Sequence, residues 1–482
     1  MITSIGFRWF RSFRDQAELE LAPITLLYGQ NSAGKSSVLK SLLFLKQNVG
    51  DTSENGEFSY TSRLVDLGSS RAMAYLHRSH EPTSFNFVCM VKLPVELGGR
   101  ENGDSRVEVG FHLPHDEIDS QVSYRFKDLP DEPTIMWDMS TVGESRRVWI
   151  LKNDSLDAFR RLFGGVSSSV DGEDPTGGID LWTRPVMSCI GMLPGIQIGT
   201  YSGSYREFPR FRSDGSTYRA ALVPTSGWSW DAFAANGLRA AVADSLRRTI
   251  HIGPARRLLN RIEPSAMVAD PSDPGLLVAL RQDDVLRTRL NQRLASLGID
   301  YEVVSRRVED AVLGEIHSLE LRNVKSGAVT ALTDVGYGIS QVLPIVMEAH
   351  RPGQSLLLIE QPELHLHPKL QAELADLFIS TALGGARTNF LIETHSEAII
   401  LRLLKRIREG RLSHEAVRVI YVDQDSEGVS TAINLRIDED GEFVDRWPSG
   451  FFDERIKELL DDHDLVRDNA DSPGEYVPEE DE

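Results

Sequence analysis

The chain has 482 residues, of which 41% are hydrophobic and 26% charged, so it is long enough for two or three domains with cores of normal size. Its net charge of −20 argues against a surface that coats nucleic acid, because phosphate binding needs local positive potential. The two distant cysteines indicate neither a disulfide framework nor a thiolate metal site, and no apolar run approaches the about 20 residues that cross a bilayer, so we expect a cytoplasmic protein without a membrane partner.

The N-terminal part is predicted to alternate between strands and a helix. We expect a strand over residues 2–13, a buried strand over 24–28, a loop over 29–34 and a helix over 36–47. Beyond them, short runs separated by turn-rich pieces predict an antiparallel meander, with strands at 84–92, 106–113, 121–126 and 147–151.

The middle of the chain is predicted to be mainly helical, over residues 153–312, and residues 316–329 then return to strand-like alternation around a turn. The last organised block alternates buried strands with helices, which predicts a parallel core. Its strands are expected at 356–359, 389–393 and 417–422, and its helices at 369–379 and 397–408. The acidic tail, residues 468–482, is expected to be disordered.

A phosphate-binding loop is predicted between the second strand and the first helix, where residues 29–36 match GxxxxGK[ST] in full. In such a loop, backbone N–H groups surround the phosphates, Lys35 places a charge near the β- and γ-phosphates, and the Ser36 hydroxyl can coordinate Mg²⁺. The expected nucleotide contacts are Gly29, Gln30, Asn31, Ser32, Ala33, Gly34, Lys35, Ser36 and Ser37.

A carboxylate ends the buried strand at 356–359, where Glu360 precedes Gln361, Pro362 and Glu363. Strands of a parallel core open at their carboxyl ends on the ligand crevice. We therefore place Glu360 on the metal side of the site, beside Ser36 and through a water molecule.

Two further motifs lie near strand and helix ends. His395 follows the strand at 389–393 and is a candidate to hydrogen-bond the γ-phosphate, although a lone histidine is more often a satisfied packing residue. Residues 334–341 form a small, flexible turn before an apolar helix at 342–349, and Gly338, Ser340 and Gln341 are its candidate phosphate contacts. Alone, this turn would be an ordinary capped helix start.

These four motifs, in this order, resemble the ABC-type ATPases of the RecF/SMC and OLD-like branch, where they are Walker A, the signature, Walker B and the switch histidine. The runs GYGISQVLPIV, IEQPELHLHP and ETHS, with the IHIGPARR run and the WPSGFFDE ending, are similar to a bacterial subfamily of predicted ATPases found among phage-defence genes. That subfamily includes ATPase subunits of Septu- and PARIS-like systems and carries a C-terminal segment of unknown function.

The resemblance implies an α/β fold: an ABC-type P-loop ATPase head with a mixed sheet core, an antiparallel β lobe and an inserted helical lobe. The expected division is an N-terminal head lobe at 1–152, the helical lobe at 153–312, a C-terminal head lobe at 313–445 and a terminal segment at 446–482. It also implies ATP and Mg²⁺ as ligands, and a homodimer or higher oligomer in which Ser340 of one subunit faces Lys35 of another.

One departure concerns catalysis. In the wider family the Walker B strand ends in Asp-Glu, and the second carboxylate orients the attacking water, whereas this chain has Glu360 and Gln361. An amide cannot accept a proton as a carboxylate does. Unless Glu363 turns inward to replace it, we expect slow hydrolysis and a clamp held closed by ATP.

Three functions remain open at this point. The first is a regulatory ATPase that controls a separate effector, most plausibly a nuclease, in phage defence. The second is a RecF-like DNA clamp, for which the basic run from Arg402 to Arg411 is a candidate contact, although a solvated helix face is the simpler interpretation. The third is an OLD-like nuclease using Asp423 and Asp425, which fit a turn between strands better. His365 and His367 are expected to contact the dimer interface or to pack locally rather than to bind metal.

Overall fold

The computed structural model describes most of the predicted head and parts of the remaining chain. The described residues are 1–49, 58–62, 64–77, 81–91, 104–114, 120–129, 131–142, 146–151, 158, 186–190, 193–195, 207–211, 217–221, 230–254, 256, 263–264, 280, 283–310, 314–331, 334, 337–349, 355–384 and 388–448. The acidic tail and the WPSGFFDE ending after Pro448 lie outside them.

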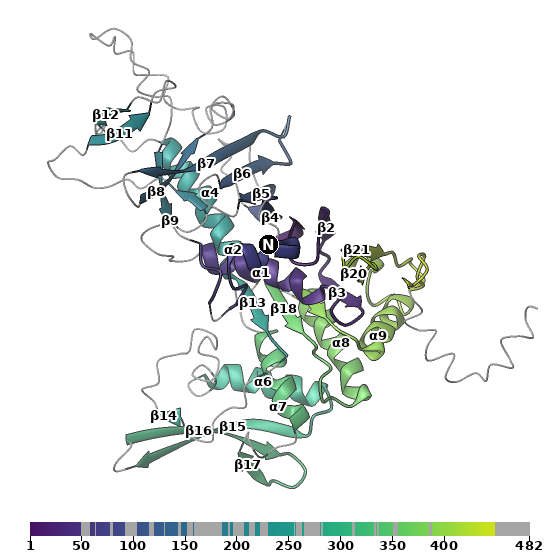
Figure 1. Cartoon of the computed structure of the whole chain (residues 1–482). Coiled ribbons are helices and arrows are strands. Elements are labelled where there is room, and N and C mark those ends of the chain that lie inside the picture. Colours follow the sequence, from purple (N-terminus) through teal and green to yellow (C-terminus); the bar gives the residue numbers. More distant parts are fainter. Residues whose placement is uncertain are drawn as a thin grey trace, which may run out of the picture.

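A six-stranded sheet at the centre of the molecule organises the fold (Figure 1). In spatial order its strands are β13 (Thr249–Ile252), β18 (Leu356–Glu360), β19 (Asn389–Glu393), β3 (Ile24–Gly29), β20 (Val417–Gln424) and β21 (Ser430–Leu435). The first five run parallel, and β21 is an antiparallel edge strand. The parallel strands are short and apolar because both faces of the sheet are covered. The predicted buried strands and the parallel core are confirmed.

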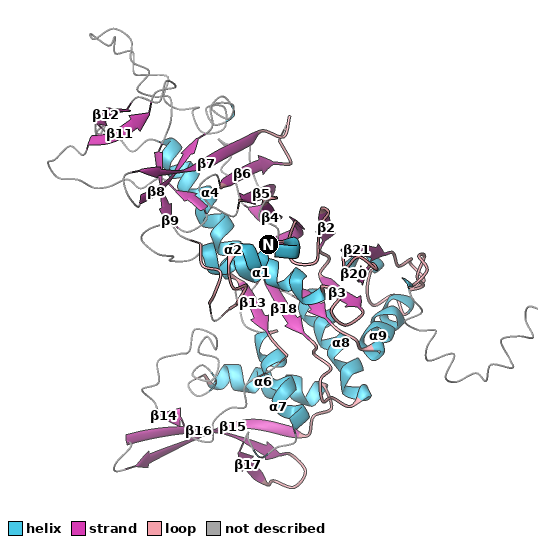
Figure 2. Ribbon diagram, in the orientation of Figure 1, coloured by secondary structure: helices cyan, strands magenta, loops and turns pink. Residues whose placement is uncertain are grey.

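Helices cover the two faces of this sheet (Figure 2). One face packs against α7 (Tyr337–Glu348), α8 (Pro368–Ala382) and α9 (Glu397–Arg408). The other face packs against α1 (Lys35–Val49) and α4 (Trp230–Arg247). Alternate residues of each strand divide between the two cores: Leu357 and Ile359 join the first, and Leu356 and Leu358 the second. The three helices predicted at 36–47, 369–379 and 397–408 are confirmed as α1, α8 and α9.

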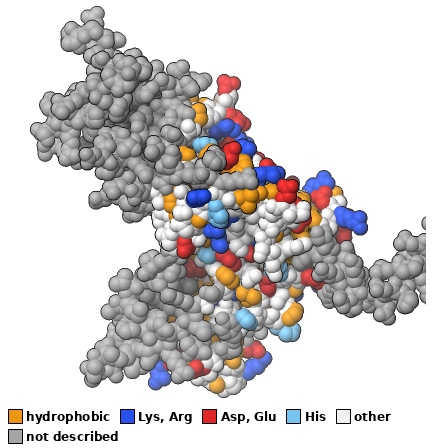
Figure 3. Space-filling model, viewed as in Figure 1, with side chains coloured by type: hydrophobic (Ala, Val, Ile, Leu, Met, Phe, Trp, Pro, Cys, Tyr) orange, Lys and Arg blue, Asp and Glu red, His pale blue; other side chains and the backbone are white. Residues whose placement is uncertain are grey.

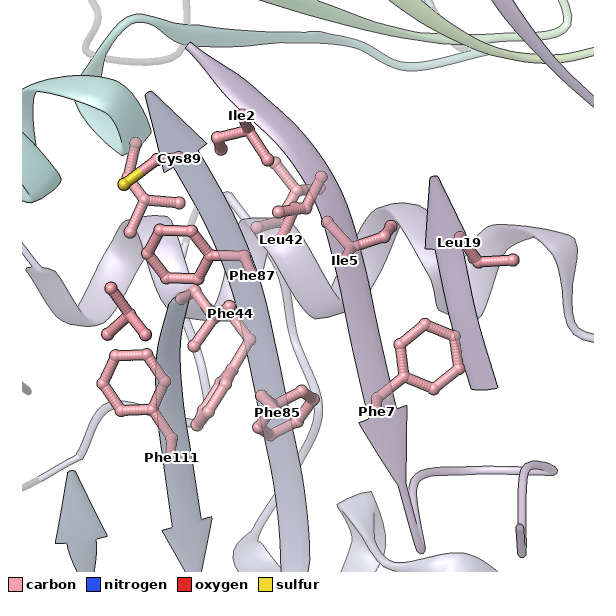
Figure 4. Close-up of a cluster of buried hydrophobic side chains, with 14 of the residues drawn as sticks. Ile2, Ile5, Phe7, Leu19, Leu42, Phe44, Phe85, Phe87, Cys89 and Phe111 are labelled. Carbon is pink, nitrogen blue, oxygen red and sulfur yellow. The ribbon is translucent and has the colours of Figure 1, made fainter. Parts of the chain in front are cut away.

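A nine-stranded antiparallel sheet forms a separate lobe beside α1 and α4. In chain order its strands are β1 (Ile2–Arg8), β2 (Ala17–Glu20), β4 (Thr83–Val91), β5 (Ser105–Leu113), β6 (Gln121–Phe126), β7 (Thr134–Val142), β8 (Arg146–Leu151), β9 (Val186–Ile190) and β10 (Leu193–Gly195). Phe44 of α1 points into a cluster with Phe85, Phe87 and Phe111 of the sheet (Figure 4). The predicted meander is confirmed, and aromatic burial joins it to the helix that follows the phosphate loop.

One long strand predicted over residues 2–13 is wrong. β1 ends at Arg8, and Phe10 and Phe13 then pair across a tight turn. Trp9 and Arg11 adopt positive φ values of 53° and 55°, which a strand cannot contain. The alternation of apolar and polar residues continues through the turn because both phenylalanine rings are buried, so the pattern alone does not reveal the end of the strand.

The helical lobe predicted over 153–312 is only partly helical in its described residues. Besides α4 and α6 (Asp284–Ser296) it contains strands, of which β13 belongs to the central sheet. A hairpin of β11 (Glu207–Phe211) and β12 (Thr217–Ala221) is separate. A third sheet consists of β14 (Glu263–Pro264), β15 (Tyr301–Asp310), β16 (Gly314–Asn323) and β17 (Val329–Ala331). The last two strands confirm the predicted alternation around the turn, where Gly327 has a φ of 69°. The four-part division remains a prediction.

The helix predicted at 342–349 begins earlier than expected. α7 starts at Tyr337, so Gly338 to Gln341 lie within its first turns and not in a loop before it. The short elements α2 (Ser70–Met73), η1 (Tyr75–His77) and η5 (His414–Ala416) complete the described helices.

An aromatic cluster joins the C-terminal segment to the strand before the phosphate loop. Trp447 packs edge-on against Tyr28 of β3, with ring centroids 5.6 Å apart, and also against Tyr421 and Phe443. Tyr28 is fully buried, and its hydroxyl donates to the Ser396 carbonyl at 2.7 Å. The segment before residue 449 therefore belongs to the core that supports the phosphate loop.

Replacing Phe378 with alanine tests the core between the sheet and α8. The Phe378 ring is fully buried, 5.0 Å from that of Phe390. Its loss leaves a cavity, and we expect the free energy of unfolding to fall by about 3–5 kcal/mol in denaturant titrations. The control is Leu401→Ala on α9, where the leucine is 44% exposed. Its free energy of unfolding is expected to change by no more than about 0.5 kcal/mol. Equal losses in both variants would contradict this packing.

Candidate functional site

The phosphate loop lies between β3 and α1, as the sequence predicts. Gly29 ends the strand with a φ of 143°, and a Cβ atom there would lie 2.0 Å from the Val422 carbonyl oxygen of β20. Gly34 has a φ of 109°, and a Cβ atom there would lie 2.8 Å from Ser12 Oγ. Both positions need glycine for backbone conformation and for space. Ser430 Oγ donates to the Ala33 carbonyl at 2.6 Å, so β21 holds the loop from outside.

Lys35 is folded back over this loop. Its Nζ atom donates to the carbonyls of Gly29 and Gln30 at 2.8 and 2.7 Å, and the residue is 4% exposed. Burial lowers the pKa of the ammonium, and the nearby carboxylates of Glu393 and Glu363 act in the opposite direction. The side chain is therefore held inside the curve of the loop, where a bound phosphate would meet a positive charge.

The carboxyl ends of β18, β19 and β3 form one polar edge. Their parallel register places Glu360 opposite Glu393, and Glu393 opposite Leu27 of the phosphate-loop strand. Glu360 accepts a hydrogen bond from His251 Nε2 of β13 at 2.7 Å. The Ser36 hydroxyl donates to the two Glu393 carboxylate oxygens at 2.8 and 3.0 Å. Within one chain, then, the carboxylate that contacts Ser36 is that of Glu393, while Glu360 lies one strand farther from the loop.

The donor set of this edge fits Mg²⁺. The Ser36 hydroxyl and the carboxylates of Glu360 and Glu393 are hard oxygen donors, which this ion prefers. Among the described residues no group of three or more His, Cys, Asp and Glu side chains is arranged to hold a metal. That is compatible with an ion held by one or two protein oxygens together with nucleotide phosphates. Burial, and secondarily the charge of Glu360, raises the pKa of Glu393, and the bond from Ser36 opposes this shift.

The loop after β18 turns Glu363 toward the end of β19. Its two carboxylate oxygens accept hydrogen bonds from the Thr394 hydroxyl and the His395 backbone N–H, both at 2.7 Å. Gln361 begins the turn with a φ of 45°, and its N–H donates to the Glu393 carbonyl. The inward turn on which a catalytic role of Glu363 depends is therefore present, but hydrogen-bond donors already hold both oxygens.

His395 lies half-buried after β19, close enough to Lys35 for their charges to interact. Burial lowers the pKa of its imidazole, and the positive charge of Lys35 lowers it further. A neutral ring can both donate and accept hydrogen bonds, which suits a contact with phosphate oxygen or water.

The first turns of α7 pack directly against the loop after β18. A Cβ atom on Gly338 would lie 2.9 Å from the His365 carbonyl oxygen, so glycine allows this close contact. Ser340 is half-buried, and Gln341 is 1% exposed. The Gln341 Nε2 atom has no hydrogen-bond partner among the described residues. The helix start expected to face a second subunit thus packs against the loop after β18, at the polar edge of its own subunit.

Three residues of the site were not identified from the sequence: His251, Arg256 and Glu393. The Arg256 guanidinium is 6% exposed and donates to the carbonyls of Glu360 (2.9 Å), Gln361 (3.0 Å) and Gln341 (3.4 Å). It therefore ties the end of β18 to α7. The IHIGPARR run contains His251 and Arg256, and Glu393 ends a buried strand just as Glu360 does. Applying the strand-end argument to both strands would have found Glu393.

The other candidates have local roles. His367 caps α8, accepting from the Lys369 N–H, and Asp425 accepts from Glu427 N and Val429 N in the turn between β20 and β21. These contacts favour the packing and turn interpretations over metal binding. In the basic run, Arg402 and Arg406 pair with Asp376 of α8, and other members pair with Glu409 and Glu442. On the face in Figure 3, the described positive and negative side chains are interspersed.

Comparison with protein families finds two matches. Residues 203–401 match a family described as "AAA domain, putative AbiEii toxin, Type IV TA system". This range contains α7, β18, β19 and His395 but begins after the phosphate loop. Residues 412–461 match a family of unknown function, DUF3696, and include β20, β21 and Trp447. Among curated proteins, none matches the chain.

Solved structures similar to the chain include heads of SMC proteins. One is an Smc head bound to the C-terminal winged-helix domain of ScpA, with 12% identity, a TM-score of 0.45, and coverage of 91% of this chain and 98% of that one. The SMC head from Thermotoga maritima has 10% identity, a TM-score of 0.39, and coverage of 90% and 99%. The Smc head with an extended coiled coil from Pyrococcus furiosus, bound to the C-terminal domain of ScpA, has 11% identity, a TM-score of 0.38, and coverage of 97% and 99%.

The phosphate loop, the parallel sheet that carries it and the matched AAA domain define the class of this protein. The complete phosphate-loop motif and the AAA match over residues 203–401 together indicate a P-loop ATPase, and the fold that carries them is mixed α/β. ATP is the nucleotide that this class implies. Among the described helices, none is long and apolar enough to span a membrane.

Arg256→Met tests the tie between β18 and α7. Methionine fills much of the space of the arginine stem but removes the N–H donors to three carbonyls. Hydrogen bonds to charged groups contribute about 1.5–3 kcal/mol. We therefore expect hydrogen exchange in peptides covering the start of α7 and residues 360–366 to be roughly 10- to 100-fold faster. The control Arg289→Met changes an exposed residue on α6 and should leave these peptides unaffected. Unchanged exchange in Arg256→Met would show that the tie is dispensable.

Proposed function

We propose that this protein is a slow ABC-type ATPase that acts as a dimeric, nucleotide-gated clamp and regulates a separate effector nuclease in antiphage defence. The observation that carries the ATPase part is the convergence of the phosphate loop, Ser36, two strand-end carboxylates and His395 at one edge of the sheet. The protein is proposed to work in the cytoplasm.

Nucleotide binding follows from the loop. Backbone N–H groups between Gly29 and Ser37, at the start of α1, are proposed to surround phosphate oxygens, and the helix N-terminus adds favourable partial charge. Lys35 exchanges its bonds to the loop carbonyls for bonds to phosphate. Ser36 and Glu360 are proposed to hold Mg²⁺, which when bound neutralises charge on the β- and γ-phosphates.

Slow hydrolysis follows from the residues near the expected water. Gln361 stands where a carboxylate acts as base in the wider family, and an amide does not take up a proton there. Glu363 is the nearest replacement in the sequence, but Thr394 and the His395 N–H hold its oxygens. We propose that Glu363 instead positions the residues after β19, including His395.

We propose that two subunits together form each complete nucleotide site, because the start of α7 would contact the nucleotide bound to a neighbouring head. Gly338, Ser340 and Gln341 would supply this contact, in the head-to-tail arrangement that the family resemblance implies. Gln341 is buried with an unused donor in the described chain, and Arg256 ties α7 to the subunit's own nucleotide edge. A movement of α7 when one nucleotide site closes would therefore also move the polar edge of the subunit that contains this helix, and so alter the second nucleotide site.

The effector role rests on the family comparison. The matched AAA family is described by a toxin and a type IV toxin–antitoxin system, which points to an ATPase that works with a partner protein. A RecF-like DNA clamp is the alternative. It needs a basic surface, whereas the arginines of α9 are paired with carboxylates and the net charge is −20. Duplex binding with a steep salt dependence would favour that alternative.

ATP turnover by the purified protein tests the catalytic proposal. A positioned general base contributes about 10²–10⁴-fold, so we expect Gln361→Glu to hydrolyse ATP at least about tenfold faster than the wild type. Lys35→Ala should bind ATP weakly and show no turnover, because the loop loses its buried charge. Rapid wild-type turnover that Gln361→Glu does not change would show that another group is the base.

The oligomeric state with and without ATP tests the clamp. We expect light scattering to show a dimer that ATP stabilises in the wild type but not in Lys35→Ala. Ser340→Arg adds a bulky side chain to the start of α7 and leaves residues 29–37 unchanged, so it should bind ATP normally and fail to dimerise. A Ser340→Arg protein that dimerises with ATP as well as the wild type would rule out this surface.

A further inference from the structure

Glu393 is a buried carboxylate that accepts no hydrogen bond from a cationic side chain among the described residues. It ends β19, which lies between the Glu360 strand and the phosphate-loop strand, and it is 6% exposed. The neutral Ser36 hydroxyl is the group that donates to its side chain among the described residues. Lys35 is a buried cation whose charge interacts with Glu393, but its ammonium donates to the loop carbonyls instead. Buried carboxylates are normally paired with a cation or bound to a metal, and a neutral hydroxyl offsets the loss of water around such a charge less well than a cation does.

The bond to Ser36 places the carboxylate where a nucleotide-bound cation would be. In a phosphate loop of this sequence, the Ser36 hydroxyl is the group expected to coordinate Mg²⁺. An oxygen 2.8 Å from that hydroxyl lies within reach of the ion or of one of its water ligands. Glu360 lies one strand farther away and is held by His251.

We propose that Glu393 is a metal-side residue of the ATP site, which takes the nucleotide-bound Mg²⁺, or a water on it, in exchange for the Ser36 hydroxyl. This inference rests on the proposed function and adds to it a second carboxylate beside Glu360. When no metal is bound, the Ser36–Glu393 bond occupies both groups and keeps the carboxylate solvated by a hydroxyl. When Mg²⁺ enters with ATP, its positive charge would directly contact a carboxylate that, among the described residues, has only the Ser36 hydroxyl as a hydrogen-bond donor to its side chain.

The competing explanation is a purely structural hydrogen bond that orients Ser36. The two explanations differ for Glu393→Gln, which has the same size and keeps a carbonyl oxygen to accept from Ser36 but loses the charge. A structural role survives this change, whereas a role toward a divalent cation does not.

The experiment is a titration with a fluorescent ATP analogue, in Mg²⁺ and in EDTA. In the wild type we expect Mg²⁺ to tighten binding. Loss of a group that supports a metal ligand costs about 10- to 100-fold in metal affinity. In Glu393→Gln the tightening by Mg²⁺ should therefore fall about tenfold or more, while affinity in EDTA stays equal or improves. The control Glu415→Gln removes an exposed carboxylate at the opposite edge of the sheet and should behave as the wild type.

A Glu393→Gln protein that keeps the full Mg²⁺ effect would overturn the inference and leave the structural bond. If circular dichroism shows that Glu393→Gln does not fold, Glu393→Asp serves instead. It keeps the charge but withdraws it by one methylene, so the Mg²⁺ concentration at half-maximal tightening must rise, and an unchanged midpoint overturns the inference. Failure of the wild type to bind the analogue would contradict the proposed function itself, which separates the two outcomes.

Discussion

The parallel pairing of β18, β19 and β3 is the constraint on which the rest of the structure depends. Because their carboxyl ends meet at one edge, a lysine, a serine, three glutamates and a histidine from distant parts of the sequence come within reach of one another. The strands themselves are almost wholly apolar and rigidly packed between two helical layers. Polar groups can therefore lie only at the ends of the strands, where the backbone no longer continues the sheet.

Buried polar groups give this edge its order. Lys35, Arg256 and Glu393 are each nearly inaccessible, and the first two donate to carbonyl oxygens at the ends of β3 and β18. Such arrangements are costly when a partner is missing, because a desolvated charge or carbonyl then has nothing to bond. The same cost makes the geometry specific, since few alternative placements satisfy all of these groups.

Much of this arrangement could be predicted from the sequence. The phosphate loop, the buried strands and the helices α1, α8 and α9 follow from local pattern, and the location of Glu360 at a strand end follows from parallel topology. The end of β1 at Arg8, the early start of α7 and the strands within 153–312 could not be predicted, because burial after a turn and long-range strand pairing are not local properties. His251 and Arg256 act through contacts made by residues more than 80 positions away, which spacing does not reveal.

The contact between Trp447 and Tyr28 constrains how this protein can evolve. The segment that matches the family of unknown function contains β20 and Trp447. The Val422 carbonyl of β20 leaves no room for a side chain at Gly29, and the Trp447 indole packs against Tyr28. The AAA-matched segment supplies the carboxylates on the other side of the same loop. The polar edge of the sheet is therefore built from three pieces: these two segments and the N-terminal segment that contains β3. Exchange of one segment between relatives by recombination would separate surfaces that fit together, so the three pieces are expected to be inherited as a unit.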